Sequence, residues 1–175
     1  CGAGGDPDRG LTALGREAVR RMQRLGIVPD VSHAGDGTLW EILKLAEGPV
    51  IASHSNCRTL CDVRRNLTDD QLRAIRDTGG VVGVNVYHNF VHADPRQQTA
   101  AMLARHAAHM AEVMGPEYVA CGFDFCEYFG PGNEGCEGME DCSQTHNFFF
   151  ELERIGFSAA ERQAIAWENL LRVLK

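Results

Sequence analysis

The sequence predicts an α/β protein whose strands run parallel in one sheet. Four short apolar segments typical of strands alternate with segments whose apolar residues recur at helical spacing. Each strand-like segment ends in polar residues, and the active sites of parallel α/β folds lie at that end of the sheet. No G-x-G-x-x-G or Walker sequence follows the first strand, so a barrel or an open flavodoxin-type sheet remains.

The first half of the chain predicts two helix–strand units. Residues 12–25 carry apolar side chains at helical spacing and stop at a glycine, and a strand follows over 27–33. Thr38 and Glu41 match a capping box, which predicts a helix beginning at Thr38. The next strand, over 49–54, is apolar enough to be covered on both faces.

The second half continues the alternation of helices and strands. Strands are expected over 81–87 and 118–125, each after a glycine-containing turn. Helices are expected after the capping-box pair Thr68 and Gln71, over 99–114, over 148–155 and after the pair Ser158 and Glu161. Four strands separated by helices indicate a parallel sheet.

The charge balance excludes some classes of partner. The 175 residues include 24 acidic and 17 basic side chains, which gives a formal net charge of −7. Without a cluster of Lys or Arg, nucleic acid is not an expected partner. No apolar run approaches the roughly 20 residues of a membrane-spanning helix, so no transmembrane segment is expected.

The cysteines and the N-terminus bear on the cellular context. Seven cysteines without a secretion signal favour reduced thiols and a cytoplasmic, bacterial-type protein. A local disulfide between Cys136 and Cys142 stays open for an oxidising compartment. Residues 1–10 begin with Cys and form a turn-rich loop. This opening predicts a cut inside a longer protein, with residues 1–175 forming one partial domain.

The strand ends carry the residues with chemistry. His33 and His54 end consecutive strands, and neighbouring strands lie about 4.8 Å apart, so both imidazoles can reach one metal ion. Asp124 ends the last strand and could act as general base for water at a metal, or cap a helix. One guanidinium of Arg64-Arg65-Asn66, in the polar loop after His54, could bind a substrate carboxylate, or form a surface salt bridge. Each histidine could instead be a hydrogen-bonded structural residue.

Other histidines give weaker signals. His106 and His109 lie three residues apart on a predicted helix, where a solvated face is favoured over an ion site. His88 and His92 lie in the loop after the third strand and could line a pocket.

At this point the sequence resembles the membrane (renal) dipeptidase family of zinc peptidases. The similar blocks are GLTALGREAVRRMQRLGIVPDVSH, PVIASHSNCRTLCDVRRNLTDDQLRAI, GGVVGVNVY, GFDF and ENLLRVL, from about Gly10 to the C-terminus. The resemblance implies a (β/α)8 barrel in which His33 and His54 bind one of two zinc ions. It also implies that Arg65 binds the carboxylate of a dipeptide and that Asp124 shuttles the proton from water to the leaving amine. This chain departs from the family pattern at three residues: Phe123 and Cys126, beside Asp124, and Phe90.

The family's remaining ligands have no counterpart here. The family's early His-x-Asp pair and its bridging Glu belong to the first half of such barrels, and the His-x-Asp found here, His92-Ala93-Asp94, lies in the loop after the third predicted strand. A complete barrel needs about 250 residues. The resemblance therefore implies the C-terminal half of a zinc dipeptidase, inactive alone, which dimerises, aggregates or requires the N-terminal half. The alternatives are a non-catalytic barrel half that serves binding or assembly, and another metal-dependent amidohydrolase.

Overall fold

The centre of the molecule is a short parallel sheet. The computed structural model describes residues 2, 5–6 and 9–175. Strand β1 (Val82–Val84) pairs in parallel with β2 (Val119–Cys121), and Val82 lies opposite Val119. Nearly every residue of the two strands is buried, because helices cover them. The prediction of an α/β protein with parallel strands is confirmed.

The two earlier predicted strands are much shorter than expected. Single parallel bridges join Asp30 to Ile51 and Ala52 to Val82, so the four segments are neighbours in chain order. Pro29 cannot donate to a ladder, and the carboxylate of Asp30 accepts the backbone N–H groups of Ser32 and Ser53. Side-chain hydrogen bonds thus replace ladder bonds where the sequence predicted continuous strands.

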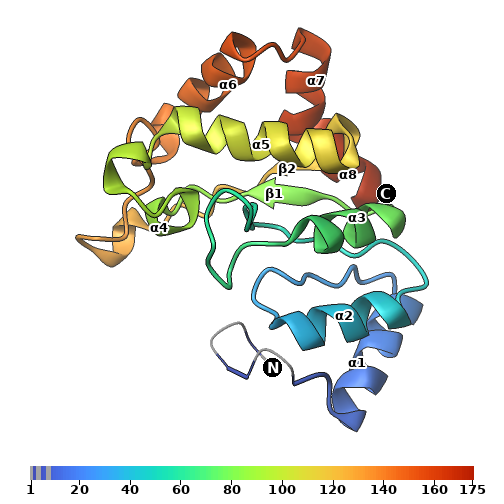
Figure 1. Cartoon of the computed structure of the whole chain (residues 1–175). Coiled ribbons are helices and arrows are strands. Elements are labelled where there is room, and N and C mark those ends of the chain that lie inside the picture. Colours follow the sequence, from blue (N-terminus) through green and yellow to red (C-terminus); the bar gives the residue numbers. More distant parts are fainter. Residues whose placement is uncertain (1, 3–4, 7–8) are drawn as a thin grey trace.

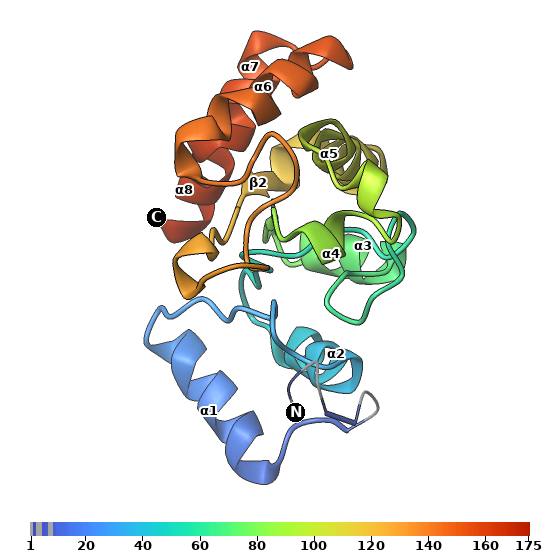
Figure 2. The ribbon, with the colours of Figure 1, turned by 90° about the vertical axis from the view of Figure 1, so that its left-hand side faces the viewer.

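The described part of the chain contains eight α-helices. They are α1 (Ala13–Arg24), α2 (Asp36–Leu45), α3 (Asp69–Asp77), α4 (His88–Val91), α5 (Ala100–Met114), α6 (Thr145–Arg154), α7 (Ala159–Gln163) and α8 (Asn169–Leu174). A π-helical turn, Ala164–Glu168, joins the last two. Successive helices pack on one another from α1 to α3, then α3 on α5 and α5 on α6 (Figure 1). Figure 2 shows them following an arc, with the strands on its inner side.

Two of the three predicted capping boxes are present in the structure. Thr68 and Gln71 cap α3 reciprocally, and Ser158 and Glu161 do the same for α7, as predicted. The capping box at Thr38 was wrong, because α2 begins two residues earlier and Thr38 lies inside it. Glu41 instead accepts from the backbone N–H of Leu11 and from Arg16, which ties the segment before α1 to α2.

The described cysteines are free thiols. Cys136 is buried and Cys142 is exposed, and neither forms the local disulfide that the sequence left open. Cys1 lies outside the described residues, as does part of the predicted loop over 1–10. Among the helices of the described chain, none is long and apolar enough to cross a membrane.

Candidate metal and substrate site

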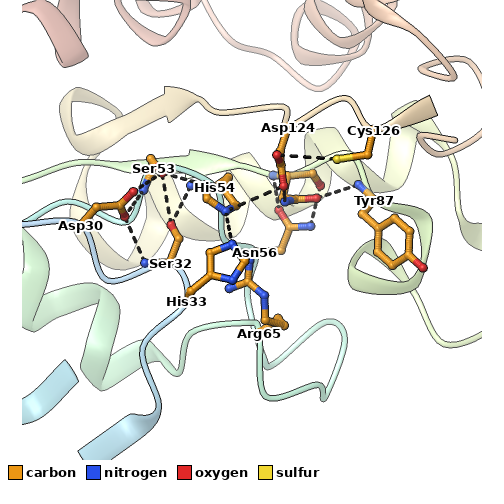
Figure 3. A network of polar contacts seen from close by, with 11 residues as sticks. Asp30, Ser32, His33, Ser53, His54, Asn56, Arg65, Tyr87, Asp124 and Cys126 are labelled. Carbon is orange, nitrogen blue, oxygen red and sulfur yellow. Dashed lines mark hydrogen bonds and ion pairs between the residues drawn. The ribbon is translucent and has the colours of Figure 1, made fainter. Parts of the chain in front are cut away.

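Two imidazoles meet at the ends of the first two parallel segments. The Nε2 atoms of His33 and His54 lie 2.9 Å apart, and the ring centroids lie 5.0 Å apart (Figure 3). His33 ends the segment that contains Asp30, and His54 ends the segment that contains Ala52. The short parallel pairing therefore brings together two side chains that are 21 residues apart in sequence.

Hydrogen bonds around His54 fix which of its nitrogens is free. The hydroxyl of Ser53 donates its only hydrogen to Asp30, so its oxygen can only accept from Nδ1–H of His54, at 2.7 Å. The proton therefore sits on Nδ1, and the Nε2 lone pair points toward His33. Histidines that bind metals in proteins are held in this way by a second hydrogen bond.

Burial, hydrogen bonds and nearby charges set the protonation states of His54 and Asp30. Burial is the main reason why the pKa of His54 is lowered; the Asp124 charge opposes this and Arg65 reinforces it. Burial alone would raise the pKa of Asp30, but hydrogen bonds from Ser53 and Ser32 outweigh it and lower the value. His54 is thus a neutral imidazole beside an ionised Asp30.

Two glycines allow the backbone to approach His54 closely. The carbonyl oxygen of Ser53 packs against Gly83 of β1 and against Gly122, directly after β2. A Cβ at either glycine would overlap this oxygen. The small residues of these segments therefore set the position from which the His54 ring extends.

Asp124 faces the pair of histidines in an unusual backbone conformation. It is the one described non-glycine residue with positive φ, at 60°, in the left-handed region that Asp tolerates better than most residues. Its Oδ2 lies 3.8 Å from Nε2 of His54 and accepts from Asn85 at 3.2 Å. The following turn is capped by Cys126, so the alternative that Asp124 caps a helix is wrong.

Arg65 approaches from the loop between the His54 segment and α3. Its Nη2 lies 3.3 Å from Nε2 of His33, and its guanidinium lies over the Phe90 ring, 5.4 Å from the centroid. Its Nη1 is buried without a hydrogen-bond partner, and burial lowers the pKa of the side chain. In the described structure Arg65 forms no ion pair, so the surface salt bridge is wrong. An unpartnered buried guanidinium nitrogen suits an anionic group of a ligand.

The arrangement of nitrogens fits a cation between the histidines. Nε2 of His33 carries either a hydrogen or a lone pair. With a hydrogen it cannot accept from Arg65, and with a lone pair it faces the lone pair of His54 Nε2. A metal ion that both lone pairs coordinate removes the conflict, and imidazole is a usual ligand of zinc. Within the described residues no three His, Cys, Asp or Glu side chains are grouped to hold a metal. The described chain thus offers two ligands of a four-ligand shell.

Four further histidines form hydrogen bonds away from this pair. His106 is fully buried, so its predicted place on a solvated face is wrong. It accepts from the backbone N–H of Cys57 and donates to the carbonyl of Val91. His109 contacts Asp69 at 2.8 Å. The rings of His88 and His92 contact nearby backbone groups, Glu134 O and Asp94 N–H.

The family model described as membrane dipeptidase (peptidase family M19) matches residues 2–175. The chain belongs to this family. The resemblance inferred from the sequence motifs is therefore confirmed.

The chain is similar to curated proteins that are longer than it is. A Klebsiella pneumoniae protein is 38% identical over 176 residues, covering 98% of this chain and 63% of its own length. An uncharacterized dipeptidase of Schizosaccharomyces pombe is 37% identical over 175 residues, which is 98% of this chain and 41% of the relative. This chain thus spans less than two thirds of these relatives.

A solved metallopeptidase of Rhodobacter sphaeroides, liganded with a phosphinate mimic of L-Ala-D-Ala, has a TM-score of 0.86 and 30% identity. The match covers 97% of this chain and 48% of that one. An amidohydrolase of Pseudomonas aeruginosa has a TM-score of 0.87 and 26% identity, with 99% and 59% covered. The fold is therefore that of the M19 metallopeptidases over nearly the whole described chain.

The sequence predicted His33, His54, Arg65 and Asp124 as site residues, and the structure brings them close together, but the residues that hold them were missed. Asp30 and Ser53 each precede a site residue within the segments PDVSH and VIASH. Their signal was a polar residue inside an otherwise apolar strand, which needs a hydrogen-bond partner when the strand is covered.

Proposed function

We propose that this chain forms part of a zinc-dependent dipeptidase and supplies one wall of its active site. The observation that carries the proposal is the convergence of the His33 and His54 Nε2 atoms beside the unpartnered Nη1 of Arg65. Membership of the M19 family and the likeness to a metallopeptidase that binds a dipeptide mimic support it.

Each residue has a distinct role in this proposal. His33 and His54 hold zinc, which when bound polarises a carbonyl and lowers the pKa of water. Arg65 binds the α-carboxylate of the dipeptide through its free guanidinium nitrogen. Asp124 takes the proton of the attacking water and delivers it to the leaving amine. Asn85 holds the carboxylate that performs this transfer.

The remaining ligands, including those of a second zinc, would come from outside this chain. We propose that residues 1–175 are one half of a barrel domain and need the other half for activity. The four neighbouring parallel segments, and the relatives that are longer than the chain, support this. A non-catalytic module and a different amidohydrolase remain as outcomes of the test.

The test compares dipeptides that differ only at the C-terminus. The intact protein, loaded with zinc, should hydrolyse a free-carboxylate dipeptide and turn over the matching amide at least ~10-fold less efficiently. Arg65→Ala should abolish this preference while leaving the melting temperature nearly unchanged, and Arg65→Lys should restore it in part because Lys keeps the charge.

Three results would contradict the proposal. Absence of turnover would favour the non-catalytic module. Equal turnover of the acid and the amide would favour another amidohydrolase. Loss of stability without a change in preference would assign Arg65 a structural role. An exposed histidine, His146, gives a matched control, because His146→Ala should leave all these values unchanged.

A further inference from the structure

Three asparagine side chains form a buried chain behind the proposed site. Asn56 and Asn66 are the last residues of the SHSN and RRN motifs, and Asn85 follows β1. All three are at most 1% exposed. A buried amide is costly unless its donors and acceptors are paired, so the contacts of these side chains show what they hold.

Asn66 ties its own loop to α4. Its side chain donates to the carbonyl oxygens of Cys61 and Phe90, both at 2.9 Å. Its carbonyl oxygen accepts from the backbone N–H of Asn56 at 3.3 Å. Arg65 precedes Asn66 directly, so these bonds fix the base of the arginine side chain.

Asn56 joins this loop to the end of β1. Its side chain donates to the carbonyl oxygens of Asn85, at 2.8 Å, and of Phe90, at 3.2 Å, and accepts from the backbone N–H of Asn85. The Phe90 carbonyl thus accepts from two asparagines. Because the Phe90 ring lies under the Arg65 guanidinium, the same bonds fix the surface on which Arg65 rests.

Asn85 extends the chain to Asp124. It accepts from the backbone N–H of Tyr87 at 2.7 Å and donates to Oδ2 of Asp124 at 3.2 Å. The side chain of Asp124 is partly exposed and its backbone has a positive φ, so this bond helps to hold the carboxylate beside His54.

We propose that Asn66 and Asn56 are positioning residues for Arg65, and that Asn85 is the positioning residue for Asp124. This inference rests on the proposed dipeptidase function. Within the described residues, the Arg65 guanidinium contacts Nε2 of His33 and the face of Phe90, so its place depends on the anchored loop and ring. The two groups at the substrate therefore share one buried amide scaffold that fixes their separation.

The experiment separates positioning from a general loss of stability. Asn66→Ala in the intact protein should raise KM for a free-carboxylate dipeptide about 10-fold, with kcat changed less than about 3-fold. The double variant with Arg65→Ala should show no further rise, because the asparagine acts through the arginine. Asn85→Ala should instead lower kcat about 10-fold with KM nearly unchanged.

Asn169 offers a matched control. It is also a buried asparagine whose side chain donates to two backbone carbonyls, those of Pro116 and Val119, at the other end of the strands. Asn169→Ala should lower the melting temperature and leave both kinetic constants within about 2-fold. The same kinetic profile for Asn66→Ala and Asn169→Ala would overturn the proposal, as would additive effects of Asn66→Ala and Arg65→Ala.

A measurement that does not depend on activity tests the position of the Arg65 side chain. Stacking on Phe90 should shift the NMR resonances of the Arg65 side chain upfield in protein labelled on arginine. This shift should vanish in Phe90→Leu and Asn66→Ala and persist in Asn169→Ala.

If the wild type hydrolyses no dipeptide, the proposed function fails, but this spectrum still tests the positioning role of Asn66. If Asn66→Ala does not fold, Phe90→Leu must reproduce the KM rise. An unchanged Arg65 resonance in a folded Asn66→Ala variant, or an unchanged KM in Phe90→Leu, would contradict the inference.

Discussion

Asp30 and His54 are connected through the hydroxyl of Ser53, which donates to the carboxylate and accepts from the imidazole. The connection links two neighbouring parallel segments and directs the free Nε2 of His54 toward His33. The carboxylate therefore belongs to the proposed metal site without being one of its proposed ligands.

Removal of the Ser53 hydroxyl should weaken zinc binding. Ser53→Ala leaves Nδ1 of His54 without its acceptor, so the ring can rotate or change tautomer, and we expect zinc affinity to fall about 10- to 100-fold. Competition titration against a zinc chelator measures this in the intact protein. Ser55→Ala is the matched control, because the Ser55 hydroxyl is buried and has no hydrogen-bond partner. Equal affinities of both variants and the wild type would exclude the proposed role of Ser53.

The buried His106 should make folding stability depend on pH. Burial, the largest cause, lowers its pKa to about 4, against 6.5 for the ordinary side chain. Above pH 6.5 the ring is neutral in both states, so it adds no pH dependence. Between pH 6.5 and 4 the unfolded chain binds a proton that the folded chain does not, and stability should fall by about 3 kcal/mol as the pH is lowered.

Urea unfolding of wild type and His106→Gln at pH 7.5 and pH 4.5 tests this expectation. The variant is less stable at pH 7.5 because two buried hydrogen bonds are perturbed, but it should lose less stability on acidification. His146→Gln, at an exposed position, should keep the wild-type pH dependence. A pH dependence that is identical in all three proteins would contradict the assignment.

The 175-residue chain alone should associate and lack dipeptidase activity. Within the described residues, the outer edges of the segment around Asp30 and of β2 are unpaired by other strands. Such edges invite pairing with another chain. Light scattering of the purified chain, with a dipeptide assay in added zinc, measures both. Robust turnover by a monodisperse monomer would mean that further ligands come from residues of this chain, with His88 or His92 the first to test.

The sequence was sufficient for the order of elements because capping residues and strand ends act locally. Thr68 and Ser158 cap helices through neighbours three residues away, which a motif records. Thr38 matches the same motif, but its hydroxyl donates to the carbonyl of Arg9 and its would-be partner Glu41 binds Leu11 and Arg16. These partners are distant in sequence, so tertiary structure overrides the local signal.

The histidines likewise fall into those whose place the sequence predicts and those whose place depends on distant partners. His33 and His54 were predictable because each ends a short parallel segment, where parallel folds gather polar groups. The buried role of His106 was not, because its partners, Cys57 and Val91, lie 49 and 15 residues away. The strands around Asp30 and Ser53 were overestimated for a similar reason. Their apolar pattern does not show that a carboxylate takes over the backbone N–H groups.

The central claim is that His33 and His54 bind the same zinc ion. X-ray absorption of the zinc-loaded intact protein measures it most directly, together with zinc content. We expect histidine scattering at ~2.0–2.1 Å, with one imidazole lost in His33→Ala and one in His54→Ala, and with zinc content reduced in both. His146→Ala should match the wild type. Full zinc content with an unchanged histidine signal in both variants would contradict the account.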